Sequence, residues 1–367
     1  NENKILNVPH LRFPEFSGEW KKCKLGDLCN VLMCKRILVS QTNTEDGVPF
    51  YKIGTIGSTP DAYISKELFD DYKVKYNYPR KGEVMITCAG TVGKCVVYDG
   101  EDAYFQDSNI VWIDNPTQYI SNGFLFHLLS KVDWRKLNST TIIRIYNDDL
   151  RNLKMSYPRK EEQQKISHLL SLLDERIATQ NKIIYKLKSL IRGIAQNMVH
   201  RGKPNVRLSD CMICNSSTLQ ESEVLESGTY PVYGANGIVG YLDCYATLNE
   251  AIYIIKDGSG VGTVFYVAGK CSAAGTLNTL QAKEGYSLQY LYYLLTVFNF
   301  EPYKTGMAIP HIYFKDYGKA KVFCPSHSEQ FKYTKLLSTI DSKLLAEQNA
   351  LVNYNLQKQY LLRQMFI

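Results

Sequence analysis

No run of about 18 apolar residues occurs in this sequence of 367 residues, so no segment is expected to cross a membrane. The first 20 residues carry charges and prolines instead of the apolar core of a signal peptide. Both absences favour a cytoplasmic protein. The hydrophobic share of 45% and the charged share of 22% are ordinary for a globular chain of about two domains.

Metal-binding patterns are also missing. Cys211 and Cys214 form one CxxC pair, but no second cysteine pair or histidine pair follows at the spacing of a zinc site. The six histidines are isolated, without an HxxxH or HExxH pair. We therefore expect free thiols, no metal site and no cofactor.

Catalytic motifs do not assemble either. The chain lacks the Asn/Asp-Pro-Pro run with which adenine methyltransferases hold a flipped base, and it lacks the GxxxxGK[ST] phosphate loop. The segment 90–94 (GTVGK) has another spacing and is followed by Cys95, so it predicts a tight turn between strands. Pro60-Asp61 and the later Asp71-Tyr72-Lys73 match a loose nuclease string that is short enough to arise by chance. We expect no catalytic residue.

What the chain does contain is a duplication. At a constant shift of 167 residues, the segment 142–174 matches 309–341 at 13 of 33 positions without a gap. The identical pairs are Ile142/Ile309, Ile145/Ile312, Tyr146/Tyr313, Asp149/Asp316, Lys154/Lys321, Pro158/Pro325, Glu162/Glu329, Gln163/Gln330, Lys165/Lys332, Leu169/Leu336, Leu170/Leu337, Ser171/Ser338 and Asp174/Asp341.

A helical seam follows each copy of this segment. Apolar residues recur at alternating intervals of four and three, which is the pattern of a coiled coil, and each seam has a polar position at Gln180 or Glu347. Each helix would span about 39 residues, or about 58 Å. We expect the two helices to pack against each other in antiparallel directions; packing of each helix on its own domain is the alternative. The seam positions are 166, 170, 173, 177, 180, 184, 187, 191, 194 and 198, and the same positions plus 167, where only Lys358 is a further departure.

Looser similarities precede the helices. The segments 24–27, 47–51 and 89–94 resemble 207–210, 228–233 and 258–263. The expected organisation is a first domain at 1–157, a helical segment at 158–202, a second domain at 203–324 and a second helical segment at 325–367. Each domain is expected to be mixed α+β. Strands are expected at 84–87, 95–98, 110–113, 252–255 and 263–267, and short helices at 124–132 and 289–298.

Several segments resemble a known family. The opening 8–16 (VPHLRFPEF) with Trp20 and 24–27 (KLGD), the Pro-to-Gln segments 158–163 and 325–330, and the loop 304–311 (KTGMAIPH) resemble the specificity subunits of type I restriction-modification systems. The first-domain equivalent of that loop, 137–144, lacks both its glycine and its proline.

The resemblance implies a non-catalytic subunit that binds double-stranded DNA and assembles with modification (methyltransferase) and restriction (translocase/nuclease) subunits. Each domain would read one half of a bipartite, asymmetric site, and the helices, related by a pseudo-twofold axis, would set the unread spacer. The alternatives are a free-standing nuclease or methyltransferase, and a coiled-coil scaffold that does not read sequence. The net charge of +7, from 43 basic and 36 acidic residues, permits a polyanionic partner without establishing one.

Candidate DNA contacts lie in expected loops or at strand ends, where a rigid scaffold presents binding residues. They are Lys52, Lys81 and Arg144 in the first domain, and Tyr233, Asn236, Lys304, Thr305 and His311 in the second.

Overall fold

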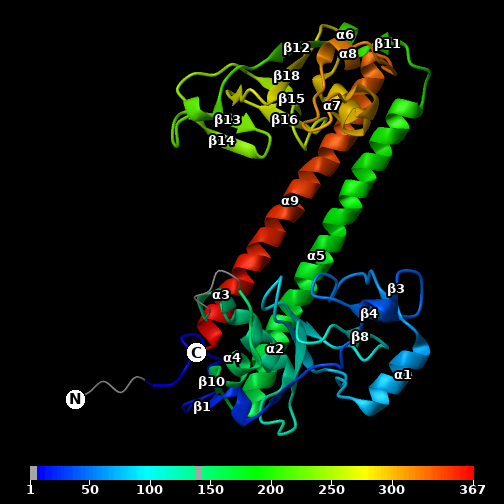
Figure 1. Ribbon diagram of the computed structural model, residues 1–367. Helices are drawn as coiled ribbons and strands as arrows, with labels where there is room; N and C mark the ends of the chain where they lie inside the picture. Colours follow the sequence, from blue (N-terminus) through cyan, green and yellow to red (C-terminus); the bar gives the residue numbers. More distant parts are fainter. Residues whose placement is uncertain (1–5, 138–142) are drawn as a thin grey trace. The chain divides into compact units, whose positions relative to one another are not determined.

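The computed structural model describes residues 6–137 and 143–367. The chain divides into two compact units, residues 1–179 with 351–367, and residues 180–350. Both units combine strands with helices, and both contain part of each of two long helices (Figure 1). The predicted α+β class, with two mixed domains and two long helices, is confirmed.

The first unit is built on an antiparallel four-stranded sheet in the order β2-β9-β6-β7. The strands are β2 (Asn30–Leu32), β9 (Ile110–Asp114), β6 (Val84–Thr87) and β7 (Cys95–Val97). The central strand β6 is buried on both faces: Val84 and Ile86 pack beneath helix α2 (Asn122–Lys131), and Met85 packs in a second core. Burial on both faces explains why β6 is apolar without alternation.

That second core lies under a smaller sheet in the order β3-β5-β4-β8. Its strands are β3 (Thr42–Asn43), β5 (Tyr63–Ile64), β4 (Val48–Tyr51) and β8 (Tyr104–Phe105), and helix α1 (Lys66–Lys75) follows β5. Strands β1 (Lys21–Lys24) and β10 (Lys154–Tyr157) form a separate antiparallel pair. The short helices are η1 (Leu25–Asp27), η2 (Val39–Gln41), α3 (Trp134–Leu137) and α4 (Asn147–Arg151).

The second unit repeats this plan. Its main sheet has the order β12-β18-β15-β16, with β12 (Met212–Ser216), β18 (Leu277–Ala282), β15 (Glu250–Ile255) and β16 (Val264–Ala268), and helix α7 (Leu288–Val297) packs on it. A smaller sheet joins β14 (Gly237–Leu242), β13 (Tyr230–Gly234) and β17 (Ser272–Ala273). Strand β11 (Val206–Arg207) pairs with β19 (Lys321–Val322). The short helices are α6 (Leu208–Cys211), η3 (Glu221–Glu223), η4 (Glu301–Tyr303) and α8 (Phe314–Tyr317).

Equivalent strands occupy equivalent places in the two main sheets, and the helices that cover them begin alike. The hydroxyl of Ser121 accepts from the Phe124 amide at 3.3 Å at the start of α2, and Ser287 accepts from the Tyr290 amide at 3.2 Å at the start of α7. Both serines are favourable N-cap residues. The strands and short helices expected from the sequence are confirmed, within one or two residues at most ends.

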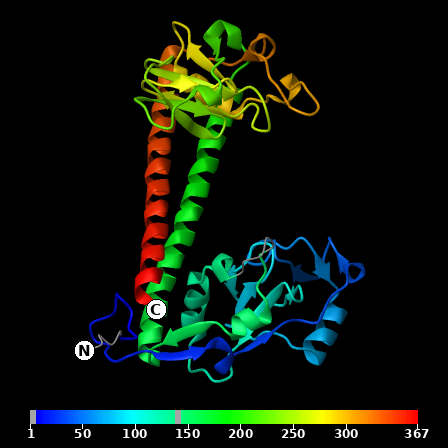
Figure 2. The same ribbon diagram turned by 60° about the vertical axis from the view of Figure 1, so that its left-hand side comes forward.

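The long helices are α5 (Lys160–His200) and α9 (His327–Met365), which run side by side in both ribbon views (Figure 2). All twenty predicted seam positions are buried or half-buried, and none is exposed. The helices are antiparallel: Asp174 pairs with Lys358 in the first unit, and in the second Gln180 Nε2 donates to the Glu347 carbonyl at 2.9 Å. The two polar seam positions therefore meet each other.

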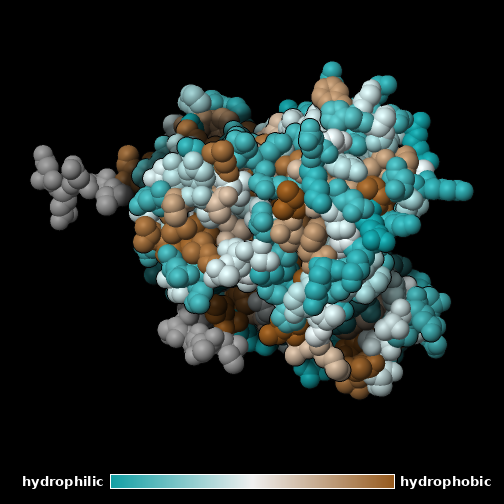
Figure 3. Space-filling model, turned by 90° about the horizontal axis from the view of Figure 1, so that it is seen from above, coloured by the Kyte–Doolittle hydropathy of each residue, from teal (hydrophilic) through white to brown (hydrophobic). Residues whose placement is uncertain are grey.

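In the part of the chain that the structure describes, neither the long helices nor the shorter ones have the apolar stretch that a bilayer crossing requires. The face shown in Figure 3 is mostly hydrophilic, with apolar residues in small separate groups.

Candidate nucleic-acid interface

Loops gather at one end of each main sheet, around the residue that follows the central strand. In the first unit this residue is Cys88, whose amide donates to the Asn109 carbonyl at 2.7 Å and whose carbonyl accepts from the Ile145 amide at 2.8 Å. These bonds tie together three segments that are distant in sequence. We call the group of segments 52–57, 88–94, 106–109 and Arg144 the first loop cluster.

The second unit contains the same framework around Lys256. The Lys256 amide donates to the Thr276 carbonyl at 3.0 Å, and the Lys256 carbonyl accepts from the Ile312 amide at 2.9 Å. We call the segments 217–219, 256–263, 274–276 and 304–311 the second loop cluster. The duplication therefore extends from the helices into the loops.

A glycine turn forms part of each cluster. Gly93 has a φ of +83°, and a Cβ there would lie 2.3 Å from Trp134 Cδ1; Gly262 has a φ of +89°, and its Cβ would lie 3.1 Å from the Phe300 side chain. Both turns thus need glycine for their backbone and to admit an aromatic ring. The prediction of a tight strand-to-strand turn at 90–94 is confirmed.

The predicted contacts of the first unit separate into two places. Lys52 lies in the first loop cluster and forms an ion pair with Asp61 at 2.9 Å. Arg144 lies in the same cluster, where its Nη2 donates to the Ser108 carbonyl at 3.1 Å. Lys81 lies before β6, at the end of that strand opposite to the cluster.

Three predicted contacts of the second unit share one loop. Thr305 and His311 exchange backbone hydrogen bonds of 2.9 and 2.7 Å, and Gly306 closes the loop with a φ of +88°. His311 Nδ1 lies 2.6 Å from Asp257 Oδ1, and Lys304 forms an ion pair with Glu301 at 2.6 Å. The contact of His311 with Asp257 holds the loop against the turn that follows β15.

The remaining candidates lie on the hairpin of β13 and β14. The Tyr233 carbonyl accepts from the Ala274 amide at 2.8 Å, which places Tyr233 beside the second loop cluster. Its ring packs edge-on against Tyr253, and burial raises the pKa of the Tyr233 phenol. Asn236 occupies the tight turn between Gly234 and Gly237.

The sequence analysis missed residues that complete the first loop cluster. Arg36 Nε donates to Asp107 Oδ2 at 2.8 Å, and the Lys94 amine donates to the Ile56 carbonyl at 2.5 Å. The sequence carries no motif for them, since they meet only through the pairing of β4 with β8. The first-unit counterpart of the 304–311 loop falls largely on residues 138–142, which lie outside the described part of the chain.

The family-like opening segment serves the fold. Arg12 donates to the buried Glu162 carboxylate from Nε at 2.8 Å and from Nη2 at 2.7 Å, and the Trp20 indole donates to the same group at 3.2 Å. These contacts fix the N-terminal segment to the start of α5. In the second unit the equivalent Glu329 is exposed and interacts with Ser326 at the start of α9.

The glutamine of each Pro-to-Gln segment is a buried clamp. Gln163 accepts from the Ser121 amide at 2.7 Å and donates to the carbonyls of Tyr119 at 2.9 Å and Pro158 at 2.8 Å. Gln330 likewise accepts from the Ser287 amide and donates to the Pro325 carbonyl, both at 2.9 Å. Each clamp joins a long helix to the helix that covers the main sheet.

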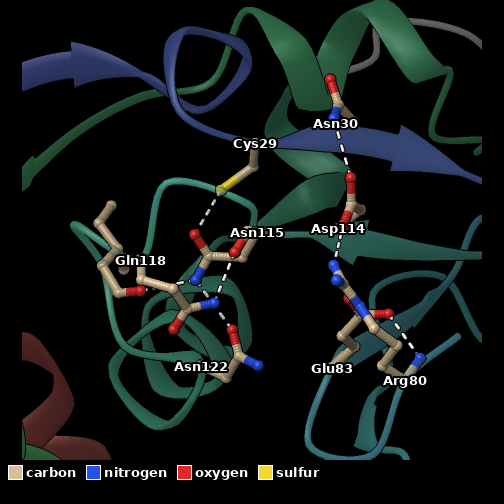
Figure 4. A network of polar contacts seen from close by, with 9 residues as sticks. Cys29, Asn30, Arg80, Glu83, Asp114, Asn115, Gln118 and Asn122 are labelled. Carbon is tan, nitrogen blue, oxygen red and sulfur yellow. Dashed lines mark hydrogen bonds and ion pairs between the residues drawn. The ribbon is translucent and has the colours of Figure 1, made fainter.

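Asn115, which stands in an Asn-Pro pair, has a structural role. Its buried amide donates to the Ile120 carbonyl at 2.6 Å and to Asn122 Oδ1 at 2.9 Å, and its oxygen accepts from the Cys29 thiol (Figure 4). The neighbouring Asp114 binds Arg80 and Asn30. This network shapes the turn into α2, at the end of β9 opposite to the loop cluster.

The loose nuclease string does not come together as a site. Asp61 pairs with Lys52, and Asp71 pairs with Lys75 at 2.5 Å. Within residues 6–137 and 143–367 there is no group of three side chains that could hold a metal ion.

The comparisons with known proteins agree with this architecture. The model of the type I restriction modification DNA specificity domain matches residues 17–189 and again 203–354. The chain therefore belongs to this family, and each match takes in one sheet-bearing region and most of a long helix. The predicted assignment as a specificity subunit of a type I restriction-modification system is confirmed.

Similar proteins carry the same designation. A Haemophilus influenzae protein named as a type I restriction enzyme specificity subunit is 46% identical over 180 residues, which cover 49% of this chain and 44% of that protein. The EcoprrI specificity subunit of Escherichia coli is 26% identical over 117 residues, covering 32% and 29%. The chain thus aligns with less than half the length of either relative.

Solved structures share the fold. The S subunit of a type I restriction-modification system from M. genitalium has a TM-score of 0.67 at 18% identity and covers 98% of this chain and 99% of its own. A chain from a type I complex has a TM-score of 0.53 at 16% identity and covers 96% and 98%.

Proposed function

We propose that this chain reads two different half-sites in double-stranded DNA, one with each loop cluster. The supporting observation is that one backbone framework occurs twice with different side chains at equivalent places. Cys88 corresponds to Lys256, and Arg144 corresponds to His311. Bases are distinguished by side-chain donors, acceptors and apolar groups, so clusters that differ in these groups should read different bases.

The recognition domains in this proposal are residues 1–157 and 203–324, and the spacers are 158–202 and 325–367. The site would be bipartite and asymmetric, with an unread spacer whose length the long helices set. Modification subunits would supply methyl transfer and restriction subunits would supply translocation and cleavage, in the cytoplasm; the solved relative from a type I complex supports such an assembly.

Genome-wide mapping of modified bases tests the proposal. The chain is co-expressed with its modification subunits in a host without such a system. We expect modification that depends on this chain, at one motif made of two different half-sites and a fixed gap. A palindromic or continuous motif, or modification that does not change when the chain is omitted, would refute it.

The individual contacts are tested by Arg144→Ala and Lys304→Ala in the full chain with its modification subunits. Each change should weaken binding to the mapped duplex about 3- to 10-fold at fixed salt, because a charged contact to DNA is lost. Lys188→Ala, at an exposed position on α5, is the matched control. Equal affinities for all three variants would remove Arg144 and Lys304 from the interface. The candidates Lys52, Lys81, Tyr233, Asn236, Thr305 and His311 can be ranked in the same assay.

A further inference from the structure

One pair of identical residues in the duplication is both aromatic and exposed. Ile145 and Ile312 are 2% and 1% exposed, so their identity follows from packing. The next pair, Tyr146 and Tyr313, is 61% and 48% exposed. Two lysine pairs of the duplication, Lys154/Lys321 and Lys165/Lys332, are exposed as well, but lysine is an ordinary surface residue. An exposed pair of large aromatic side chains that is retained in both units calls for a cause other than packing.

Helix capping does not supply that cause. Tyr146 and Tyr313 are the N-cap residues of α4 and α8, and their carbonyls accept from the Asp149 and Asp316 amides at 3.0 and 2.9 Å. Serine, threonine, aspartate and asparagine are preferred there because their side chains bond the helix, and no side-chain bond of this kind is made by either tyrosine. Among the described residues, neither phenol hydroxyl makes a hydrogen bond within the protein.

Each ring is instead flanked by cationic or basic groups. The Arg144 guanidinium lies 6.0 Å from the centre of the Tyr146 ring. The Lys315 amine lies 5.2 Å from the centre of the Tyr313 ring, and the His311 ring stacks on it at 6.5 Å with an interplanar angle of 23°. An exposed hydroxyl donor beside a fixed positive charge suits an anionic oxygen.

We propose that Tyr146 and Tyr313 are equivalent anchors that donate their hydroxyls to backbone phosphates of DNA, one beside each half-site. The inference rests on the proposed reading of two half-sites. Bases differ between the half-sites, whereas the phosphodiester backbone is the same at both. A residue that is retained in both units while Arg144 and His311 differ therefore fits the shared feature. The tyrosines position each loop cluster and carry no sequence preference.

The test measures DNA binding by the full chain with its modification subunits, for Tyr146→Phe, Tyr313→Phe and the double variant. One fluorescent duplex carries the mapped site and a second has the same composition in shuffled order. Each single change should weaken binding to both duplexes by a similar factor of about 5 to 10, because one hydrogen bond to a charged oxygen is lost. The double variant should show about the product of the two factors, and the mapped motif should stay the same. Tyr185→Phe, at an exposed position of α5, should bind like the unaltered chain.

Three results would overturn the proposal. The first is unchanged affinity of the double variant for both duplexes. The second is a loss confined to the mapped duplex, which would make the tyrosines base readers. The third is loss of the modification subunits on gel filtration, which would make them protein contacts. If the unaltered chain itself fails to distinguish the duplexes, the proposed function fails; if it distinguishes them and the variants match it, only this inference fails.

Discussion

Gln163 shows how a single side chain links a long helix to the helix that covers the main sheet. Its side-chain amide makes three hydrogen bonds, and the residue is fully buried. Gln163→Ala leaves one amide and two carbonyls without these partners, which should lower the free energy of unfolding by about 2–4 kcal/mol. Urea unfolding measures this loss, and Gln164→Ala, exposed and one residue later, is the control. Equal stability of the two variants would show that the clamp contributes nothing.

His127 is the residue for which a pH effect is expected. It is 1% exposed, and burial lowers its pKa to about 4. In the unfolded chain a histidine has a pKa of about 6.5, so between pH 6.5 and 4 the unfolded state binds the extra proton. Stability should therefore fall as the pH falls through this window, by up to about 3 kcal/mol.

The measurement compares the unaltered chain with His127→Phe by urea unfolding at pH 7, 5.5 and 4.5. Other groups titrate in both proteins, so the difference between the two isolates His127. The stability gap should move in favour of the phenylalanine variant as the pH falls. His168→Phe, at an exposed position, should follow the unaltered chain. A gap that does not change with pH would contradict the assignment.

The contact between the helix that covers the main sheet and the long helix beside it is made by different residues in the two units. Tyr293 of α7 donates to Asp341 of α9 at 2.5 Å. Its counterpart in α2 is His127, which stays 4.0 Å from the equivalent Asp174, and there Lys358 supplies the partner for the aspartate. The residue equivalent to Lys358 in the second unit is the apolar Ile191. The first unit has His127 where the second has Tyr293, and Lys358 binds the aspartate in place of the tyrosine hydroxyl. This role accounts for a lysine at an otherwise apolar seam position.

The arrangement of the second unit can be transferred to the first by two substitutions. Lys358→Ile alone should lower the free energy of unfolding by about 1–3 kcal/mol, because Asp174 loses its cation. Adding His127→Tyr should restore most of the loss, since the phenol can then donate to Asp174 as Tyr293 does to Asp341. Urea unfolding of the two single variants and the double variant gives the coupling between the sites. Additive effects would show that the two arrangements are not equivalent.

At the level of elements, periodicity predicted the long helices and main strands because burial imposes a period on the sequence. The seam at 166–198 and the strand at 84–87 are examples. Contacts between segments that are distant in the sequence could not be predicted from it. Arg36 reaches Asp107 only through the pairing of strands, and Lys81 and Lys52 looked alike in sequence yet lie apart. Glu162 and Glu329 stand in the same sequence motif, but only Glu162 accepts hydrogen bonds from Arg12, because the N-terminal segment packs in the first unit.

For the whole molecule, the duplication gives each unit the same scaffold and leaves the loop side chains free to differ. The clamps at Gln163 and Gln330 connect each scaffold to a long helix. In the proposed function, the two units determine the half-sites and the long helices determine the length of the gap between them. A change in helix length should therefore alter the gap and leave both half-sites unchanged.

That separation can be measured by lengthening both helices. Because Gln180 contacts Glu347, four residues inserted after Gln180 and four after Ala346 keep this pair opposed. Four residues add about 6 Å of helix at 1.5 Å per residue. This length corresponds to about one or two base pairs at a rise of about 3.4 Å each. Four residues inserted after Glu45, in an exposed turn, form the control.

The decisive measurement is the motif of modified bases in cells that express each variant with the modification subunits. The helix variant should modify the same two half-sites with a gap one or two base pairs longer, and the control should keep the original gap. An active helix variant with the original gap, or with new bases in either half-site, would contradict the account.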